Sequence, residues 1–282
     1  MNASGARISL LDRFSIEFAP PAQEPKPTGN LAPSAQRLLA HLGLYGARAR
    51  SAVAGALWPD VPEEQAQGSL RTTLWRLQKV APGLVDCSQA SVRLVSGVAV
   101  DVQEVEAWAR QVFEARTDVL ALRTPRSALH GELLPGWYQD WVLVERERLR
   151  QLRLHALEVL SVRLADVGHF AQAVEAADAA VVAEPLRESA QRALITVHIA
   201  EGNLLEGLRR YDAYRALLAD ELGVPPTPLM DALVHPLLRG RRPALSSAKA
   251  HLRTTDRPRS GRNRRQRDSD GLSRGPAPYE GD

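Results

Sequence analysis

The chain is poor in cysteine, with Cys87 alone among 282 residues. A single cysteine excludes an internal disulfide framework and any cysteine-rich zinc site, and it fits a reducing cytoplasm. Aromatic residues make up only 5% of the sequence, while Ala and Leu are abundant, a composition that favours helices over sheets. No apolar run approaches the ~18 residues needed to cross a bilayer, and no secretory leader is evident. We therefore expect a soluble protein with no membrane partner.

The motifs of common enzyme classes are also missing. The sequence has no Gly-rich phosphate loop followed by Lys-Ser or Lys-Thr, no GxSxG turn, no HExxH and no cysteine pair at metal-ligand spacing. Seven histidines are scattered along it, and we interpret His155, His169 and His198 as surface or core side chains and not as ligands or bases. The sequence thus indicates no catalytic residue, no metal and no cofactor. An enzyme that uses an unrecognised site stays open as an alternative.

The length of the chain, 282 residues, suggests two domains.

Charge is distributed unevenly along the chain. The formal balance of Lys and Arg against Asp and Glu is +3 over residues 1–100, −7 over residues 101–238 and +7 over residues 239–282. A polyanion would therefore approach the two ends of the chain, and the acidic middle would face another partner.

The stretch EEQAQGSLRTTLWRLQKV, residues 63–80, predicts an amphipathic helix. At roughly 100° per residue, one side collects its apolar positions. These are Ala66, Leu70, Thr73, Leu74 and Leu77. The other side collects Gln65, Arg71, Thr72, Trp75, Arg76 and Lys79. Cations neutralise phosphates, and Arg with small polar groups can recognise base edges, so this face suits a DNA major groove. A merely solvated helix face is the alternative.

The neighbouring segments predict a winged helix. A hairpin of residues 7–18, a helix from Pro33 to Gly46 and a short helix capped by Ser51 precede residues 63–80. A second hairpin of residues 84–95 and a possible strand at residues 98–102 follow. In a winged helix the third helix enters the major groove and the hairpin lies over the backbone. Arg93 in this hairpin is then a phosphate or minor-groove candidate, although a solvated role is equally open.

From Val102 onward the pattern predicts helices almost throughout. Their expected bounds are 102–115, 141–167, 170–183, 187–201, 204–222 and 226–238. Gly168-His169-Phe170 and Gly202-Asn203-Leu204 occupy equivalent corners 34 residues apart, the period of a tetratricopeptide repeat. Stacked helix pairs leave a concave surface that usually binds protein.

The last segment, residues 239–282, is rich in Arg, Ser, Gly, Pro and Asp and has almost no large apolar side chains. Such a composition cannot offset the entropy of ordering, so we expect disorder. Its densest cationic run, RSGRNRRQR, either grips DNA non-specifically or only aids solubility.

Three motifs carry a resemblance to a known family. They are GSLRTTLWRLQK, then GELLPGWYQDWVLVERERLRQLRLHALE, then ADELGVPPTPLMDALV. In this order they resemble the Streptomyces antibiotic regulatory protein family, over residues 7 to about 238, with an OmpR-type winged helix and a bacterial transcriptional activator domain. The resemblance implies a cytoplasmic, nucleoid-associated activator of antibiotic biosynthesis genes. It would bind direct repeats in double-stranded DNA, recruit RNA polymerase and self-associate head to tail on DNA.

The resemblance also implies roles for particular residues. Arg71, Thr72, Arg76 and Lys79 fall on the recognition face, and Arg93 falls in the wing. The turn carrying Trp58, Asp60 and Val61 matches the loop that lies towards polymerase in OmpR-type activators. Gly68 and Trp75 are departures from the family pattern on the same face, and we include Trp75 among the DNA-binding candidates.

We therefore expect a mainly α protein of two folded domains. Residues 1–101 form a winged helix-turn-helix with a small sheet and a hairpin wing, residues 102–238 a tetratricopeptide-like activator domain, and residues 239–282 an Arg-rich tail. The expected function is sequence-specific transcriptional activation. The alternative is a protein-interaction adaptor whose helical repeats act while its DNA-binding domain is vestigial.

Overall fold

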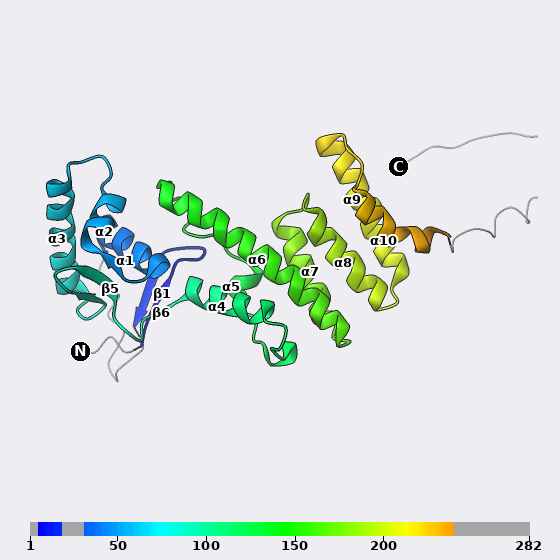
Figure 1. Cartoon of the computed structure of the whole chain (residues 1–282), viewed down its shortest axis with the longest axis horizontal. Coiled ribbons are helices and arrows are strands. Elements are labelled where there is room, and N and C mark those ends of the chain that lie inside the picture. Colours follow the sequence, from blue (N-terminus) through cyan, green and yellow to red (C-terminus); the bar gives the residue numbers. More distant parts are fainter. Residues whose placement is uncertain (1–4, 19–30, 240–282) are drawn as a thin grey trace, which may run out of the picture. The chain divides into compact units, whose positions relative to one another are not determined.

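The computed structural model describes residues 5–18 and 31–239. These residues are mainly helical and include two three-stranded sheets, as Figure 1 shows, which confirms the expected fold class. The expectation of a disordered tail lies outside the described residues, apart from Arg239, which ends the last helix. None of the helices in the described ranges is long and apolar enough to cross a membrane.

Helices dominate from the second third of the chain onward. The helices are α1 Pro33–Tyr45, α2 Arg50–Leu57, α3 Glu63–Val80, α4 Asp101–Phe113, the 3-10 turn η1 Val119–Ala121, α5 Arg126–Leu129, α6 Asp140–Asp166, α7 Phe170–Ala183, α8 Glu188–Ala200, α9 Leu204–Leu222 and α10 Pro228–Arg239. The strands are β1 Ala6–Ser9, β2 Ser15–Phe18, β3 Arg48–Ala49, β4 Val85–Cys87, β5 Ser91–Leu94 and β6 Ala99–Val100.

The first sheet has the strand order β2-β1-β6. Strand β1 pairs antiparallel with β2, as expected for the first hairpin, and parallel with β6. The expected third strand, residues 98–102, is therefore shorter than predicted, and Val102 belongs to α4. Asp101 is the first residue of α4, and its buried carboxylate accepts the backbone N–H groups of Leu10, Leu11 and Val102, which ties the start of the helix to the chain after β1.

The second sheet has the order β3-β5-β4 and includes a strand that the sequence did not predict. Arg48 and Ala49 of β3 pair with Val92 and Ser91 of β5. The prediction that Ser51 caps the next helix is wrong. Helix α2 begins at Arg50, whose backbone N–H donates to the carbonyl of Ala90 at 3.0 Å and so satisfies one of the N–H groups that the first turn leaves without an intrahelical partner.

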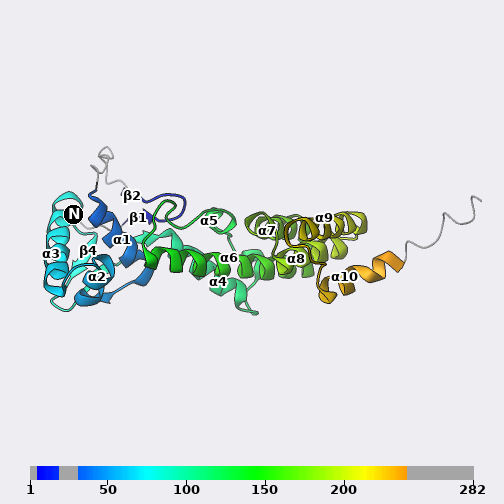
Figure 2. The same cartoon turned by 90° about the horizontal axis from the view of Figure 1, so that it is seen from above.

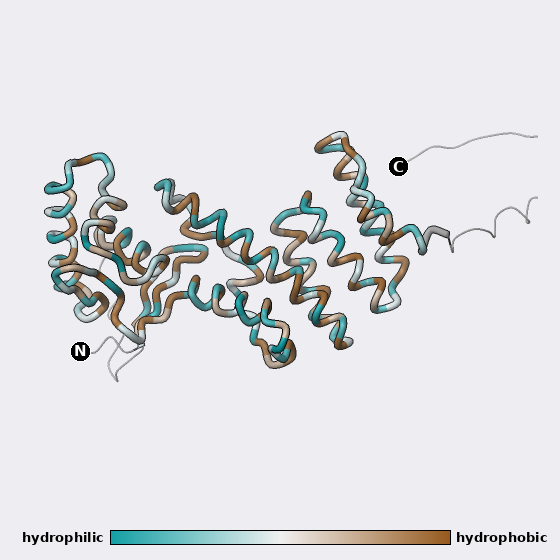
Figure 3. The backbone as a smooth tube through the Cα atoms, in the orientation of Figure 1, coloured by the Kyte–Doolittle hydropathy of each residue, from teal (hydrophilic) through white to brown (hydrophobic). Residues whose placement is uncertain are grey.

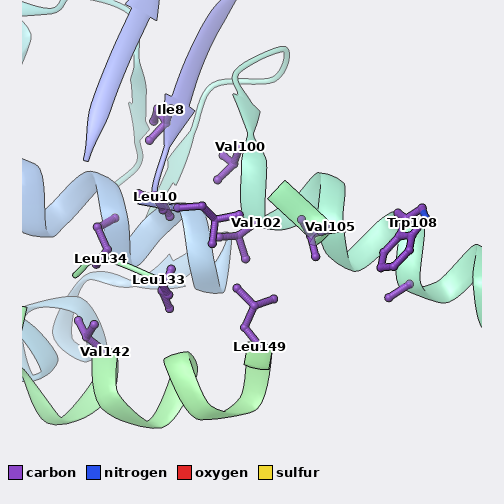
Figure 4. Close-up of a cluster of buried hydrophobic side chains, with 14 of the residues drawn as sticks. Ile8, Leu10, Val100, Val102, Val105, Trp108, Leu133, Leu134, Val142 and Leu149 are labelled. Atoms are coloured by element: carbon purple, nitrogen blue, oxygen red, sulfur yellow. The ribbon is translucent and has the colours of Figure 1, made fainter. Parts of the chain in front are cut away.

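The segment Gly131–Trp137 joins the winged helix to α6. Leu11 forms an isolated bridge with Leu133, and the backbone N–H of Leu134 donates to the carbonyl of Leu10 at 2.8 Å. Leu133 and Leu134 are fully buried in a cluster that also contains side chains from β1, β6, α4 and α6, as Figure 4 shows. Arg146 of α6 donates to the carbonyls of Leu133 and Leu134 and so holds the segment in place. Residues 5–18 and 31–239 accordingly group into one compact unit.

A second contact links α1 to α6 through aromatic rings. The ring of Trp141 lies 5.4 Å from His41 and 6.5 Å from Tyr45, measured between centroids. Trp137 stacks on Phe14 at 6.0 Å. These tryptophans fill gaps between elements.

The two repeat corners are equivalent in the structure. Gly168 and Gly202 have φ values of 79° and 85°, a region that favours glycine. At the first corner the N–H of His169 donates to Leu164, and at the second that of Asn203 donates to His198, at 2.9 and 2.8 Å. The same turn therefore recurs after 34 residues, in agreement with the tetratricopeptide-like prediction.

The short elements η1 and α5 were not expected, because three or four residues show no periodicity.

Candidate nucleic-acid interface

Helix α3 has the predicted bounds, and the charged residues at its two ends stabilise a helix. Pro62 precedes it, Glu63 and Glu64 occupy its first turn and Lys79 its last, so each charge opposes the partial charge of the nearer helix end. Ala66, Leu70, Thr73 and Leu77 are buried as predicted, whereas Leu74 is only half-buried against the core.

The opposite face of α3 is open. Figures 1 and 2 show α3 at the outer edge of the winged helix, with α1 and α2 on its inner side. Hydrophilic residues, coloured teal, recur along it in Figure 3. The candidate contacts on this helix are all exposed to solvent: Arg71, Thr72, Trp75, Arg76 and Lys79. The structure therefore brings five of the six proposed DNA contacts together on one helix face.

Two details set the chemistry of this face. The hydroxyl of Thr72 donates to the carbonyl of Gly68 at 3.0 Å, one turn earlier in the same helix. The ammonium of Lys79 lies 3.7 Å from the ring centroid of Trp75, a cation–π contact, while the Trp75 side chain remains 60% exposed. Lys79 thus orders the indole ring and still presents a positive charge outward.

The guanidinium groups of α3 are available to a ligand. Within residues 5–18 and 31–239, Arg71 and Arg76 form no hydrogen bond or ion pair, whereas arginines of α6 are engaged by carbonyls and carboxylates. A cation that has no carboxylate partner gives up no ion pair when it contacts a phosphate or a base edge. The face is therefore suited to a polyanion.

The wing hairpin carries the sixth candidate, Arg93. It lies directly opposite Asp86 across β4 and β5, and its Nη2 and Nε donate to Oδ2 of Asp86 at 2.6 and 2.9 Å. The Arg93 side chain is 56% exposed, so it can still reach solvent, but part of its charge is neutralised.

Burial raises the pKa of the Cys87 thiol at the end of β4, which keeps this cysteine protonated at neutral pH.

The structure adds two cations that the sequence analysis missed. Arg48 in β3 lies 5.6 Å from the Tyr45 ring centroid, and Arg50, which follows, donates to the carbonyl of Ser88 at 3.4 Å. Strand β3 pairs with β5, so Arg48 belongs to the sheet that contains the wing hairpin, and Arg50 lies beside it as the first residue of α2. The only local signal was the triplet Arg-Ala-Arg after Gly46, which is too short to predict a strand.

The expected polymerase-facing turn is only partly exposed. Trp58 and Val61 are half-buried and pack against the hydrophobic core, while Asp60 is exposed. Of these three side chains Asp60 is the one that a partner can reach most easily.

No metal site is evident in the described part of the chain, where no group of three or more His, Cys, Asp and Glu side chains is placed to hold an ion. His198 is buried and its ring nitrogens lack hydrogen-bond partners, while His155 and His169 are exposed.

Comparison with known proteins identifies the helical region. Residues 100–238 match the family model of the bacterial transcriptional activator domain. The regulatory protein AfsR of Streptomyces coelicolor is 34% identical over 232 residues, which cover 78% of this chain and 23% of that protein. The regulatory protein AfsR of Streptomyces griseus is 33% identical over 205 residues, which cover 67% of this chain and 21% of that protein. The chain thus spans less than a quarter of the length of these relatives.

A solved structure supports the fold. Mycobacterium tuberculosis EmbR, solved in complex with a low-affinity phosphopeptide, matches with a TM-score of 0.58 and 20% identity, over 83% of this chain and 65% of that chain. This likeness concerns the fold, while the activator-domain match and the AfsR relatives support a transcriptional regulator. Residues 100–238 belong to the bacterial transcriptional activator domain family, and the similarity to the two AfsR regulators agrees with the resemblance carried by the three motifs.

Proposed function

We propose that this chain is a sequence-specific activator that binds double-stranded DNA at short direct repeats upstream of promoters. The observation that carries the proposal is the exposed face of α3, where Arg71 and Arg76 have no partner among the described side chains. The major groove of B-DNA admits one α-helix, and bidentate arginine contacts to guanine are the commonest specific contacts there. Residues 1–101 would recognise the DNA.

The wing sheet would fix the register of α3 on the duplex. Arg48, Arg50 and Arg93 lie on or beside its strands and would contact phosphates. Arg93 would exchange Asp86 for a phosphate, whereas Arg48 has only a cation–π contact to give up. Such contacts position a protein on DNA without reading sequence.

Residues 102–238 would place a protein surface near RNA polymerase, together with exposed Asp60 of the turn that precedes α3. Two copies on tandem half-sites would meet head to tail, because direct repeats are related by translation along the helix and not by a two-fold axis. The target genes would belong to secondary-metabolite, in particular antibiotic, pathways, as the relationship to the AfsR regulators suggests. The protein would act in the cytoplasm at the nucleoid.

A pair of double variants tests DNA recognition by α3. Purified protein would be used to select binding sites from random-sequence duplex DNA, and the affinity of each variant for the selected site would be measured. Arg71→Ala with Arg76→Ala should weaken specific binding by about 2–6 kcal/mol, since each bidentate contact contributes about 1–3 kcal/mol. The control is Arg209→Ala with Arg215→Ala, which removes two exposed arginines of α9 and should change affinity little.

The same variants separate the activator from the adaptor alternative in cells. An activator loses regulation of its target promoters with the α3 double variant. A chain that keeps its regulatory effect after this change would act through its helical repeats, and the proposal would be wrong.

A further inference from the structure

The exposed face of α3 has a centre line and two flanks. At roughly 100° per residue, Gly68, Thr72, Trp75 and Lys79 project within roughly 30° of one direction. Arg71 and Arg76 project at roughly 70° on opposite sides of that direction. A helix that enters a groove along this direction would place the centre line on the base edges and one arginine towards each wall.

Two groups dominate the centre line of this face. Gly68 has no side chain, and the hydroxyl hydrogen of Thr72 is used by the carbonyl of Gly68. Lys79 lies over the face of Trp75, which leaves the indole as the largest group on the line. The indole is therefore the main apolar surface that this face presents to the floor of the groove, beside the charge of Lys79. The apolar feature of the major groove is the C5-methyl group of thymine.

Trp75 has no packing role in the fold. All five tryptophans lie within the described residues, and Trp75 is the only exposed one, whereas Trp108 is buried and the other three are half-buried. Trp75 lies on the face that also carries Arg71 and Arg76, where its ring offers a partner a large apolar surface with a polar edge. The stacked Lys79 lowers the entropy that the indole would lose on binding.

Gly68 also indicates that another molecule comes close to the backbone of α3. A Cβ atom at this position would meet only Nη2 of Arg71, at 3.8 Å, so packing within the protein does not require glycine. Glycine inside a helix is less stable than alanine. Its presence is accounted for if another molecule comes close to the helix backbone at this point.

From these observations we propose that Trp75 is a specificity-determining residue that reads thymine methyl groups at the centre of each half-site. Arg71 and Arg76 contact the purines or phosphates on either side. The inference rests on the proposed entry of α3 into the major groove, and it adds the class of base pair that this groove must present.

Removal of single methyl groups from the DNA tests the proposal. A binding site is first selected from random duplex DNA with the wild-type protein, and each thymine is then replaced in turn by deoxyuridine, which lacks only the methyl. Replacement at one or two central positions should weaken wild-type binding roughly fourfold, the loss expected for one buried methyl group. Trp75→Ala should bind the unmodified site more weakly and should show no loss at those positions.

The control variant is Val80→Ala, which shortens another exposed apolar side chain of α3 that projects away from the centre line. It should keep the wild-type response to deoxyuridine. Circular dichroism should show that both variants remain folded, because neither side chain is buried.

The outcomes separate this inference from the proposed function. If no sequence is enriched, DNA recognition itself fails. If a site is enriched but its affinity is insensitive to deoxyuridine, or if Trp75→Ala keeps the full sensitivity, DNA binding stands and the role of Trp75 is overturned.

Discussion

Arginine side chains serve two different purposes in this chain. Arg146 donates to the carbonyls of Leu133, Leu134 and Trp137, and it is therefore part of the fold. Arg71 and Arg76 on α3 have no such partners in the described ranges and contribute charge instead. Both kinds look alike in the sequence, where all carry the same charge. Only the carbonyls brought together by the fold distinguish them.

His41 gives a pH-dependent prediction at the junction of α1 and α6. Burial, and secondarily the charge of Arg48, lowers the pKa of His41 to about 4, against an ordinary value of 6.5. The folded state therefore favours the neutral ring. Its contribution to stability is fully present above pH 6.5 and is lost as the pH falls through the range between 6.5 and about 4.

Measurement of unfolding free energy against pH checks this prediction. Each pKa unit corresponds to about 1.4 kcal/mol, so His41 should account for about 2–3 kcal/mol of acid destabilisation. His41→Leu removes the titrating group and should lose less stability than the wild type over that range. Parallel curves for the two proteins would contradict the assignment.

Helix α3 shows a conflict between stability and proposed function at Gly68. Gly68→Ala should raise the free energy of unfolding by up to ~1 kcal/mol, because alanine favours the helix and the added methyl meets only Arg71 at a distance of 3.8 Å. The same methyl should reduce affinity for DNA if the groove approaches the backbone there. Thermal melting and binding titration of one variant measure both effects. A variant that is more stable and binds as well as the wild type would show that nothing approaches Gly68.

Helices with apolar periodicity and Gly or Pro stops were predicted well from the sequence. The bounds of α3, α7 and α9 are those expected, since local periodicity and corner glycines define them. The six residues proposed to bind DNA are all exposed where the sequence placed them, five on α3 and Arg93 in the wing.

Features that depend on distant pairing were not predictable in this way. Strand β3 exists because Arg48 and Ala49 pair with β5, more than forty residues further along the chain. The burial of Asp101 likewise depends on distant residues, because its carboxylate accepts the N–H groups of Leu10 and Leu11. For the same reason the positions of Arg48 and Arg50 beside the wing hairpin could not be predicted from local sequence.

The chain as a whole separates charge by function. Its positive balance over residues 1–100 includes the face of α3, and the negative balance of residues 101–238 coincides with the activator domain that matches the family model. DNA would thus be attracted to one end of the described residues and repelled by the helical region. The account therefore predicts that DNA contacts the α3 face and not the helical region.

Genome-wide footprinting of the tagged protein in its host tests this account most directly, followed by titration of bound sequences at several salt concentrations. We predict enrichment at a few promoters that share a short direct repeat, with each mismatched base pair costing about 1–3 kcal/mol. Diffuse occupancy, with binding in vitro that disappears at moderate salt for every sequence, would mean that the contact is only electrostatic. That result would contradict sequence-specific activation and would leave the helical repeats as the working part of the protein.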